Sequence, residues 1–194
     1  MNCLKLKNIK KLYFGYEELA RMLNISVDAA RVTASRYVKQ GLLIRLKRNL
    51  YVLAERWEKF QDKDLFQLAN IIQTPSYVSL MSALCYYEIS TQIQRGFIES
   101  IALNRTAIRN VLELEFSYFK INKHLYSDFV RVENYFIACA EKAFVDAVYL
   151  KYLGNYNFDS SSIDFDKLCK SKIKEILKNF PDKFVNYYNR NECF

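Results

Sequence analysis

The stretch SVDAARVTASRYVKQGLLIRLKRNLYVL, residues 26–53, decides how the first part of this chain folds. Ser26 is a favourable N-cap, and Gly41 suits the left-handed conformation in which helices often end, so a helix is expected between them. Two β-prone segments follow, and the turn between them contains Asn49, a residue that tolerates positive φ. The pattern therefore predicts a helix followed by a basic β-hairpin.

A shorter amphipathic segment, YEELARMLNI, precedes this helix. Its apolar residues recur at helical spacing, and its two glutamates lie in the first turn, where they suit the helix dipole. Two short helices joined by a tight turn and followed by a hairpin are typical of a winged helix-turn-helix. We therefore predict an α+β protein in which residues 1–54 form a winged helix-turn-helix DNA-binding domain.

The helix after Ser26 is expected to have two distinct faces, since successive residues are about 100° apart. The core-facing side should carry apolar residues, namely Val27, Ala30, Ala34, Tyr37 and Val38. We expect Arg36 at the centre of the opposite, exposed face. The full set predicted for that face is Asp28, Ala29, Val32, Thr33, Arg36, Lys39 and Gln40.

The excess positive charge of the chain lies in this part of the sequence. Residues 1–54 contain eleven Lys and Arg and three Asp and Glu, whereas residues 55–194 contain eighteen of each. A basic surface attracts phosphate backbones through Coulomb steering and counterion release. Double-stranded DNA is therefore the predicted partner of residues 1–54, and a merely solvated or protein-binding face is the alternative.

In this interpretation the helix enters the major groove, and the hairpin reaches phosphates or the minor groove. Arg36 is expected to read a guanine edge, and Lys39, Lys47 and Arg48 to hold the DNA backbone. The predicted DNA-binding residues are Ser26, Asp28, Arg31, Thr33, Arg36, Lys39, Arg45, Lys47 and Arg48.

Residues 55–194 are predicted to form a mixed α/β domain with C-terminal helices. AERWEKFQDKDLFQLANII should be helical with a break near Gln61, and Ser79 should cap a helix that runs to about Ile89. GFIESIAL, LEFSYFKI and FVRVENYFIA are predicted as three strands because they are rich in β-branched and aromatic residues. ACAEKAFVDAVYLKYL is an almost wholly apolar helix, and two amphipathic helices follow it.

Catalysis in this half would depend on carboxylates. Metal-dependent nucleases combine carboxylates with a lysine in a mixed sheet, but the spacing here fits no such motif. Lys142 and Asp146 are four residues apart and are more simply a polar pair on a buried helix. We therefore predict no enzymatic activity; the nuclease alternative would use Glu99, Glu113, Glu115, Glu141, Lys142 and Asp146.

Metal and cofactor chemistry is also not expected. His124 is the only histidine and is predicted on the surface, and the five cysteines include no CxxC pair.

No apolar run approaches the ~18 residues of a membrane-spanning helix. The N-terminal sequence MNCLKLKNIKKLYF lacks the apolar core of a signal peptide. These features predict a cytoplasmic protein with no membrane association.

Three segments occur in a recognisable order: GLLIRLKRNLYVL, YVSLMSALCYYEI and IACAEKAFVDAVYL. Together they resemble the AbiEi family of antitoxins from type IV toxin–antitoxin systems, over about residues 12–190. The chain departs from the family pattern at three positions. Asn49 and Glu88 stand where the family usually has Gly, and Ala140 stands where it usually has Pro. Because Glu88 is not Gly, we expect the preceding helix to continue through it.

The resemblance implies a bacterial phage-defence protein that represses its own operon by binding inverted repeats in the promoter. It also implies that residues 55–194 neutralise a nucleotidyltransferase-like toxin encoded by an adjacent gene, by contact or by opposing its effect. The alternative is a stand-alone transcriptional regulator whose second domain dimerises or senses a ligand. The predicted partner-binding residues are Ser79, Tyr86, Tyr87, Glu141, Lys142 and Asp146.

Overall fold

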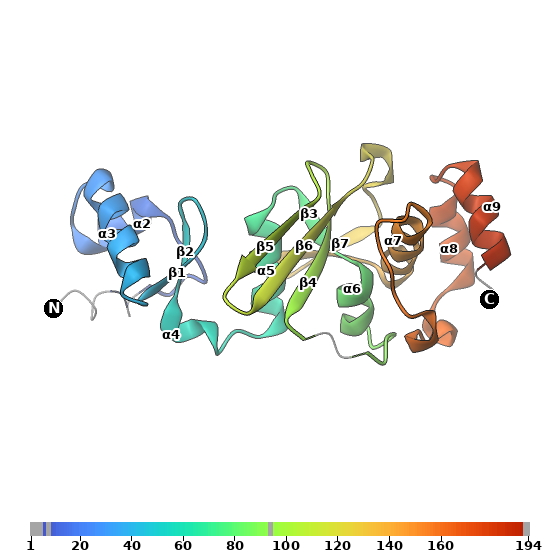
Figure 1. Ribbon diagram of the computed structural model, residues 1–194, viewed down its shortest axis with the longest axis horizontal. Helices are drawn as coiled ribbons and strands as arrows, with labels where there is room; N and C mark the ends of the chain where they lie inside the picture. Colours follow the sequence, from blue (N-terminus) through green and yellow to red (C-terminus); the bar gives the residue numbers. More distant parts are fainter. Residues whose placement is uncertain (1–5, 7–8, 93–94, 192–194) are drawn as a thin grey trace. The chain divides into compact units, whose positions relative to one another are not determined.

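The computed structural model describes residues 6, 9–92 and 95–191 and contains both helices and sheets, which confirms the α+β class. The chain divides into two compact units, Met1–Leu68 and Ala69–Phe194. Figure 1 shows the elements of both. The first unit extends beyond the hairpin that we took as its end, through α4 (Ala54–Trp57) and into α5 (Asp62–Ile72). The predicted helix break near Gln61 is confirmed.

The first unit consists of α2 (Tyr16–Leu23) and α3 (Val27–Lys39), then the antiparallel hairpin of β1 (Leu43–Lys47) and β2 (Leu50–Leu53). The residues predicted to begin and end α3 have those roles in the structure. The Ser26 side chain accepts a hydrogen bond from the Ala29 amide at 3.2 Å, which caps α3. Gly41 has φ 71°, and the Leu42 amide donates to the Tyr37 carbonyl at 2.9 Å, which closes the helix end.

The hairpin turn is bonded to the start of α2. Asn49 has φ 57°, as predicted, and its Oδ1 accepts a hydrogen bond from the Tyr16 amide at 2.6 Å. Phe14 and Tyr51 exchange two backbone hydrogen bonds, at 3.0 and 2.9 Å. A Cβ on Gly15 would lie 2.9 Å from Asn49 Oδ1, so a larger residue there would displace this contact. The hairpin is thereby held against the N-terminus of α2.

Two side chains of α3 differ from the predicted faces. Thr33 is 8% exposed, so its prediction as an exposed contact is wrong. Thr33 lies next to the buried side chains of Ala30, Ala34 and Tyr37 on α3. The elements that pack against these residues also cover Thr33. Val27 is 48% exposed because the first residue of α3 lies beyond this core cluster.

The second unit contains a six-stranded sheet with the order β5-β6-β4-β3-β8-β7. The neighbours β4–β6 and β3–β8 are parallel, and the other pairs are antiparallel. The strands are β3 (Ser76–Val78), β4 (Phe97–Ala102), β5 (Ala107–Val111), β6 (Leu114–Lys120), β7 (Phe129–Val132) and β8 (Tyr135–Ala138).

Two of the three predicted strands are confirmed, as β4 and β6, but FVRVENYFIA is not one strand. It folds back on itself as the hairpin β7–β8, with Glu133 at φ 47° in the turn. We did not predict β5, whose sequence AIRNV is largely exposed at the edge of the sheet. Such a strand carries a weak sequence signal because most of its side chains face solvent and form no apolar alternation.

Helices cover both faces of this sheet. On one face the Tyr118 hydroxyl donates to the Ala69 carbonyl of α5 at 2.7 Å. Tyr77 lies on the opposite face and contacts α7 (Ala140–Tyr152). α6 (Leu80–Tyr86) packs beside α7, which is also covered by α8 (Lys170–Leu177) and α9 (Asp182–Asn191) (Figure 1). α6 ends at Tyr86, and Glu88 has φ 56°, so the expected continuation through Glu88 is wrong.

A buried ion pair lies between the sheet and α7. Lys142 and Asp146 are both 0% exposed, and the Lys142 ammonium contacts Asp146 Oδ1. The other carboxylate oxygen accepts hydrogen bonds from the hydroxyls of Tyr77, at 3.0 Å, and Ser79, at 2.9 Å. Ser79 is the N-cap residue of α6, as predicted, but its side chain bonds Asp146 and makes no capping hydrogen bond. This network joins β3, the start of α6 and α7.

Replacing Lys142 with methionine should strongly destabilise the second unit. Lys142→Met keeps most of the side-chain volume but leaves the Asp146 carboxylate buried without its cation, at a cost of about 3–5 kcal/mol. Urea unfolding followed by circular dichroism measures the free energy of unfolding. Lys174→Met, at an exposed position of α8, is the matched control. Equal stability of both variants would show that the ion pair contributes nothing.

Candidate nucleic-acid interface

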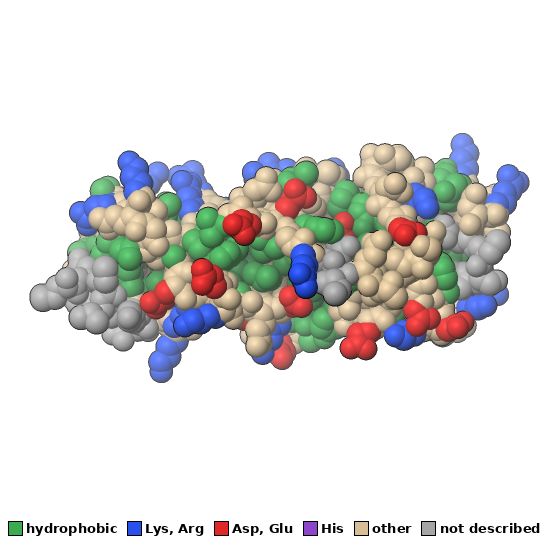
Figure 2. Space-filling model, turned by 60° about the horizontal axis from the view of Figure 1, so that its bottom comes forward, with side chains coloured by type: hydrophobic (Ala, Val, Ile, Leu, Met, Phe, Trp, Pro, Cys, Tyr) green, Lys and Arg blue, Asp and Glu red, His purple; other side chains and the backbone are tan. Residues whose placement is uncertain are grey.

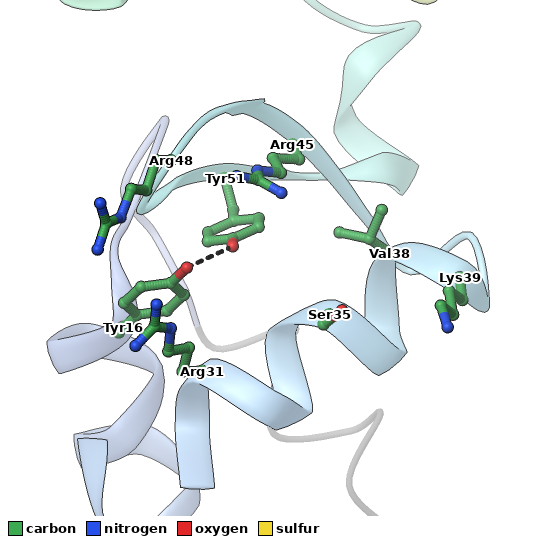
Figure 3. A pocket seen from close by; sticks show the side chains of 8 residues that line it. All are labelled: Tyr16, Arg31, Ser35, Val38, Lys39, Arg45, Arg48 and Tyr51. Atoms are coloured by element: carbon green, nitrogen blue, oxygen red, sulfur yellow. Dashed lines mark hydrogen bonds between the residues drawn. The ribbon is translucent and has the colours of Figure 1, made fainter. Parts of the chain in front are cut away.

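A concave pocket lies within the first unit, between α3 and the β1–β2 hairpin (Figure 3). Its volume is about 370 Å³, which accommodates a small anionic group. Four of its eight lining residues are Lys or Arg, and none is Asp or Glu. The lining residues are Tyr16, Arg31, Ser35, Val38, Lys39, Arg45, Arg48 and Tyr51.

Helix geometry explains how α3 contributes. Arg31, Ser35 and Lys39 are spaced four residues apart, so their side chains follow one line along the helix. Figure 3 shows Arg31 and Lys39 on α3, and Arg45 and Arg48 on the hairpin opposite. The positive charges thus approach the pocket from two separate elements.

Strand register explains how the hairpin contributes. Arg45 pairs directly with Tyr51, and directly opposed residues share one face of a hairpin. The register shifts between Arg45 and Lys47, which leaves Leu46 buried and keeps both flanking cations exposed. Arg45 and Tyr51 therefore line the pocket together, while Lys47 lies outside it.

Two tyrosine hydroxyls complete the pocket. The Tyr51 hydroxyl donates to that of Tyr16 at 3.1 Å (dashed in Figure 3). Burial and the Tyr16 contact raise the pKa of Tyr51 to about 12, although Arg45 and Arg31 act in the opposite direction. The phenol therefore keeps its proton at neutral pH. Guanidinium, ammonium and hydroxyl groups on the residues around one cavity suit a phosphate or another oxyanion.

The pocket contains only part of the predicted DNA-binding set. Arg31, Lys39, Arg45 and Arg48 line it. The remaining predicted residues lie elsewhere: Ser26 caps α3, Thr33 is buried, and Asp28, Arg36 and Lys47 are exposed outside the pocket.

Four lining residues were not predicted: Tyr16, Ser35, Val38 and Tyr51. The four-residue spacing of Arg31, Ser35 and Lys39 would have identified Ser35 from sequence. No such signal exists for the two tyrosines, because their meeting depends on how the hairpin packs against α2.

The exposed face of α3 has a different centre from the one we predicted. Val32 is 70% exposed and lies opposite the fully buried Ala30 and Ala34. Arg36 lies to one side of Val32, and its guanidinium carbon is 5.9 Å from the centroid of the Tyr37 ring. The predicted exposure of Arg36 is confirmed, but its central position is wrong.

The predicted partner-binding residues are mostly internal. Ser79, Lys142 and Asp146 are fully buried in the second unit, so a partner that docks on this structure touches none of them. Glu141 is 7% exposed and forms an ion pair with Lys172 at 2.8 Å. Of the set, Tyr86 is the most accessible, at 42% exposure, and Tyr87 is half-buried.

Glu99 is a buried carboxylate of the second unit whose pKa is raised. It is 5% exposed, and its Oε2 accepts hydrogen bonds from the Met81 amide at 3.1 Å and the Tyr156 hydroxyl at 3.0 Å. Burial raises its pKa to about 7, and these hydrogen bonds act in the opposite direction. Among the described residues, no three His, Cys, Asp or Glu side chains gather as metal ligands would.

His124 is exposed, as predicted, and the described cysteines Cys85, Cys139 and Cys169 form no disulfide. Cys3 and Cys193 lie outside the described residues.

Glu99 should make stability fall with rising pH. An acid whose pKa is higher in the folded than in the unfolded protein stabilises the fold below its unfolded pKa, and this stabilisation is lost as pH rises through the folded value. Between about pH 4.5 and 7 the stabilisation lost should reach about 3 kcal/mol.

Urea unfolding across this range should show a shallower decline in the free energy of unfolding for Glu99→Gln than for the wild type. Glu113→Gln, which changes an exposed carboxylate, should behave as the wild type; parallel curves for all three proteins would contradict the assignment.

Comparison with known proteins adds no relative: the chain matches no family model and no curated protein. Within the described part of the chain, no helix has the length and apolar character needed to cross a membrane. The fold and the pocket therefore define an α+β protein with a cationic cavity in its first unit.

Proposed function

We propose that this chain is a DNA-binding antitoxin of the AbiEi kind. Its first unit binds duplex DNA at its own promoter and represses the operon, and its second unit neutralises a nucleotidyltransferase-like toxin from an adjacent gene. The observation that carries the DNA-binding part is the pocket between α3 and the hairpin, which is lined by four cations and no acid.

The order of elements supports this proposal. Two short helices followed by an antiparallel hairpin are compatible with a winged helix, in which the second helix enters the major groove and the hairpin is the wing. A cavity between recognition helix and wing lies where a sugar–phosphate backbone would run. Figure 2 shows Lys and Arg side chains, in blue, projecting from the first unit at the left of the view.

The positions at which the chain departs from the family pattern also support the resemblance. Asn49 and Glu88 replace Gly, and both have positive φ, at 57° and 56°, the conformation that favours glycine. Ala140 replaces Pro and is the first residue of α7, where proline is favoured in helices. At all three positions the backbone suits the usual family residue.

The second and third segments of the resemblance also meet in space. Tyr77 and Ser79 of the second segment donate hydrogen bonds to Asp146 of the third. One buried network thus joins the two segments. This supports a common fold for the second unit, and the antitoxin activity is inferred from the resemblance.

Removing two cations from the pocket should weaken DNA binding most at low salt. Arg31→Ala/Arg48→Ala should reduce the slope of log affinity against log salt by up to about 2, because each lost phosphate contact releases about one counterion fewer. Fluorescence anisotropy with a duplex from the region upstream of the gene measures this slope. Lys170→Ala/Lys174→Ala, on α8, is the charge-matched control. An unchanged slope in the pocket variant would show that the pocket faces away from DNA.

Growth and promoter activity in one host test the whole proposal. The adjacent downstream gene is expressed alone, with the wild-type chain, or with the Arg31→Ala/Arg48→Ala variant, beside a reporter driven by the operon's promoter. We expect arrest by the gene alone, relief of the arrest by both chains, and repression of the reporter by the wild type only. A harmless neighbouring gene, or arrest that neither chain relieves, would reject the antitoxin role and favour a stand-alone regulator.

A further inference from the structure

Val32 is the most exposed large apolar side chain among the described residues, at 70%. It is two residues from Ala30 on one side and Ala34 on the other, and both alanines are 0% exposed. At about 100° per residue, Val32 therefore points directly away from the core. A contact with another molecule that buries this side chain would remove its apolar surface from water, which is favourable.

The residues around Val32 identify the kind of surface that it meets. Ala29 precedes it by three residues, Arg36 follows it by four, and all of them are exposed. Two residues that line the basic pocket lie close by: Arg31 precedes Val32 in sequence, and Lys39 follows it by two turns on the same side of α3. The apolar centre is thus bordered by cations, which is the charge pattern complementary to a duplex with its phosphates on the outside.

Asp28 adds a carboxylate to the exposed face of α3. It is exposed and lies four residues before Val32, on the same side of the helix. A carboxylate repels phosphate but accepts a hydrogen bond from the amino group of cytosine. At about 100° per residue, Asp28 lies between Ser35 and Lys39 and close to Val32, so the exposed face of α3 presents an acceptor and an apolar group beside the cations.

The major groove presents one apolar group, the C5-methyl group of thymine. We propose that Val32, with Ala29 beside it, recognises thymine methyl groups in the operator. This inference rests on the proposed DNA binding and deepens it, because it names the chemical feature of the base pairs that α3 reads. Val32 is then a specificity-determining residue, while the pocket supplies affinity for any sequence.

Uracil provides a direct test, because it has the hydrogen-bonding groups of thymine but lacks the C5-methyl group. The upstream duplex is prepared once with thymine and once with uracil throughout, and the affinity of the full chain for each is measured by fluorescence anisotropy. The wild type should bind the uracil duplex about fourfold or more weakly, the change expected when one methyl group is no longer buried. Val32→Ala should bind the thymine duplex more weakly by a similar factor and should no longer distinguish the two.

Two variants serve as controls. Val27→Ala removes the same atoms from an exposed valine on another side of α3 and should keep the wild-type preference for thymine. Arg36→Ala should bind both duplexes more weakly and keep the same ratio between them. Since Val32 is exposed, its replacement does not threaten folding, and circular dichroism checks this.

The outcomes separate this inference from the proposed function. Tight binding to both duplexes with equal affinity, and no effect of Val32→Ala, overturns the thymine inference and leaves DNA binding intact. No binding to either duplex rejects both. If Val32→Ala changes the sedimentation of the protein but not the thymine-to-uracil ratio, Val32 contacts another protein chain, and the inference is wrong.

Discussion

One amide oxygen at the tip of the basic hairpin organises the first unit. Asn49 Oδ1 accepts the hydrogen bond of the Tyr16 amide, and the backbone pairing of Phe14 with Tyr51 extends this contact along the second strand. Because Tyr16 and Tyr51 both line the pocket, the same contacts bring their hydroxyls to 3.1 Å. The cavity is therefore built by folding, and a ligand does not have to pay the entropy of assembling it.

The second unit depends on a buried charge. Asp146 receives Lys142 and two hydroxyl groups, so a carboxylate that would be costly to bury alone is fully satisfied. The Lys142 ammonium also lies 5.1 Å from the centroid of the Phe180 ring, which follows α8. The network thus reaches from the sheet to the C-terminal helices, and its directional bonds define one arrangement of these elements.

Helix α3 presents both cations and an apolar side chain outside the core. Arg31, Ser35 and Lys39 line the pocket, and Val32 points away from the core. In a protein–DNA complex, contacts to phosphates position the protein, and contacts to base edges carry the sequence information. A helical-wheel argument from sequence places both sets outside the core, but it misplaces Thr33, because the width of the buried stripe depends on what packs against it.

The sequence by itself determined the features that act within a few residues. These are the cap at Ser26, the left-handed turn at Asn49, the break near Gln61 and the concentration of positive charge in residues 1–54. Tertiary structure decided the reversal at Glu133 within a continuous β-prone run, the pairing of the edge strand β5, and the burial of the Lys142–Asp146 pair. The reason is physical: a cap or a turn is satisfied by its neighbours in sequence, whereas burial and strand pairing depend on residues that only folding brings close.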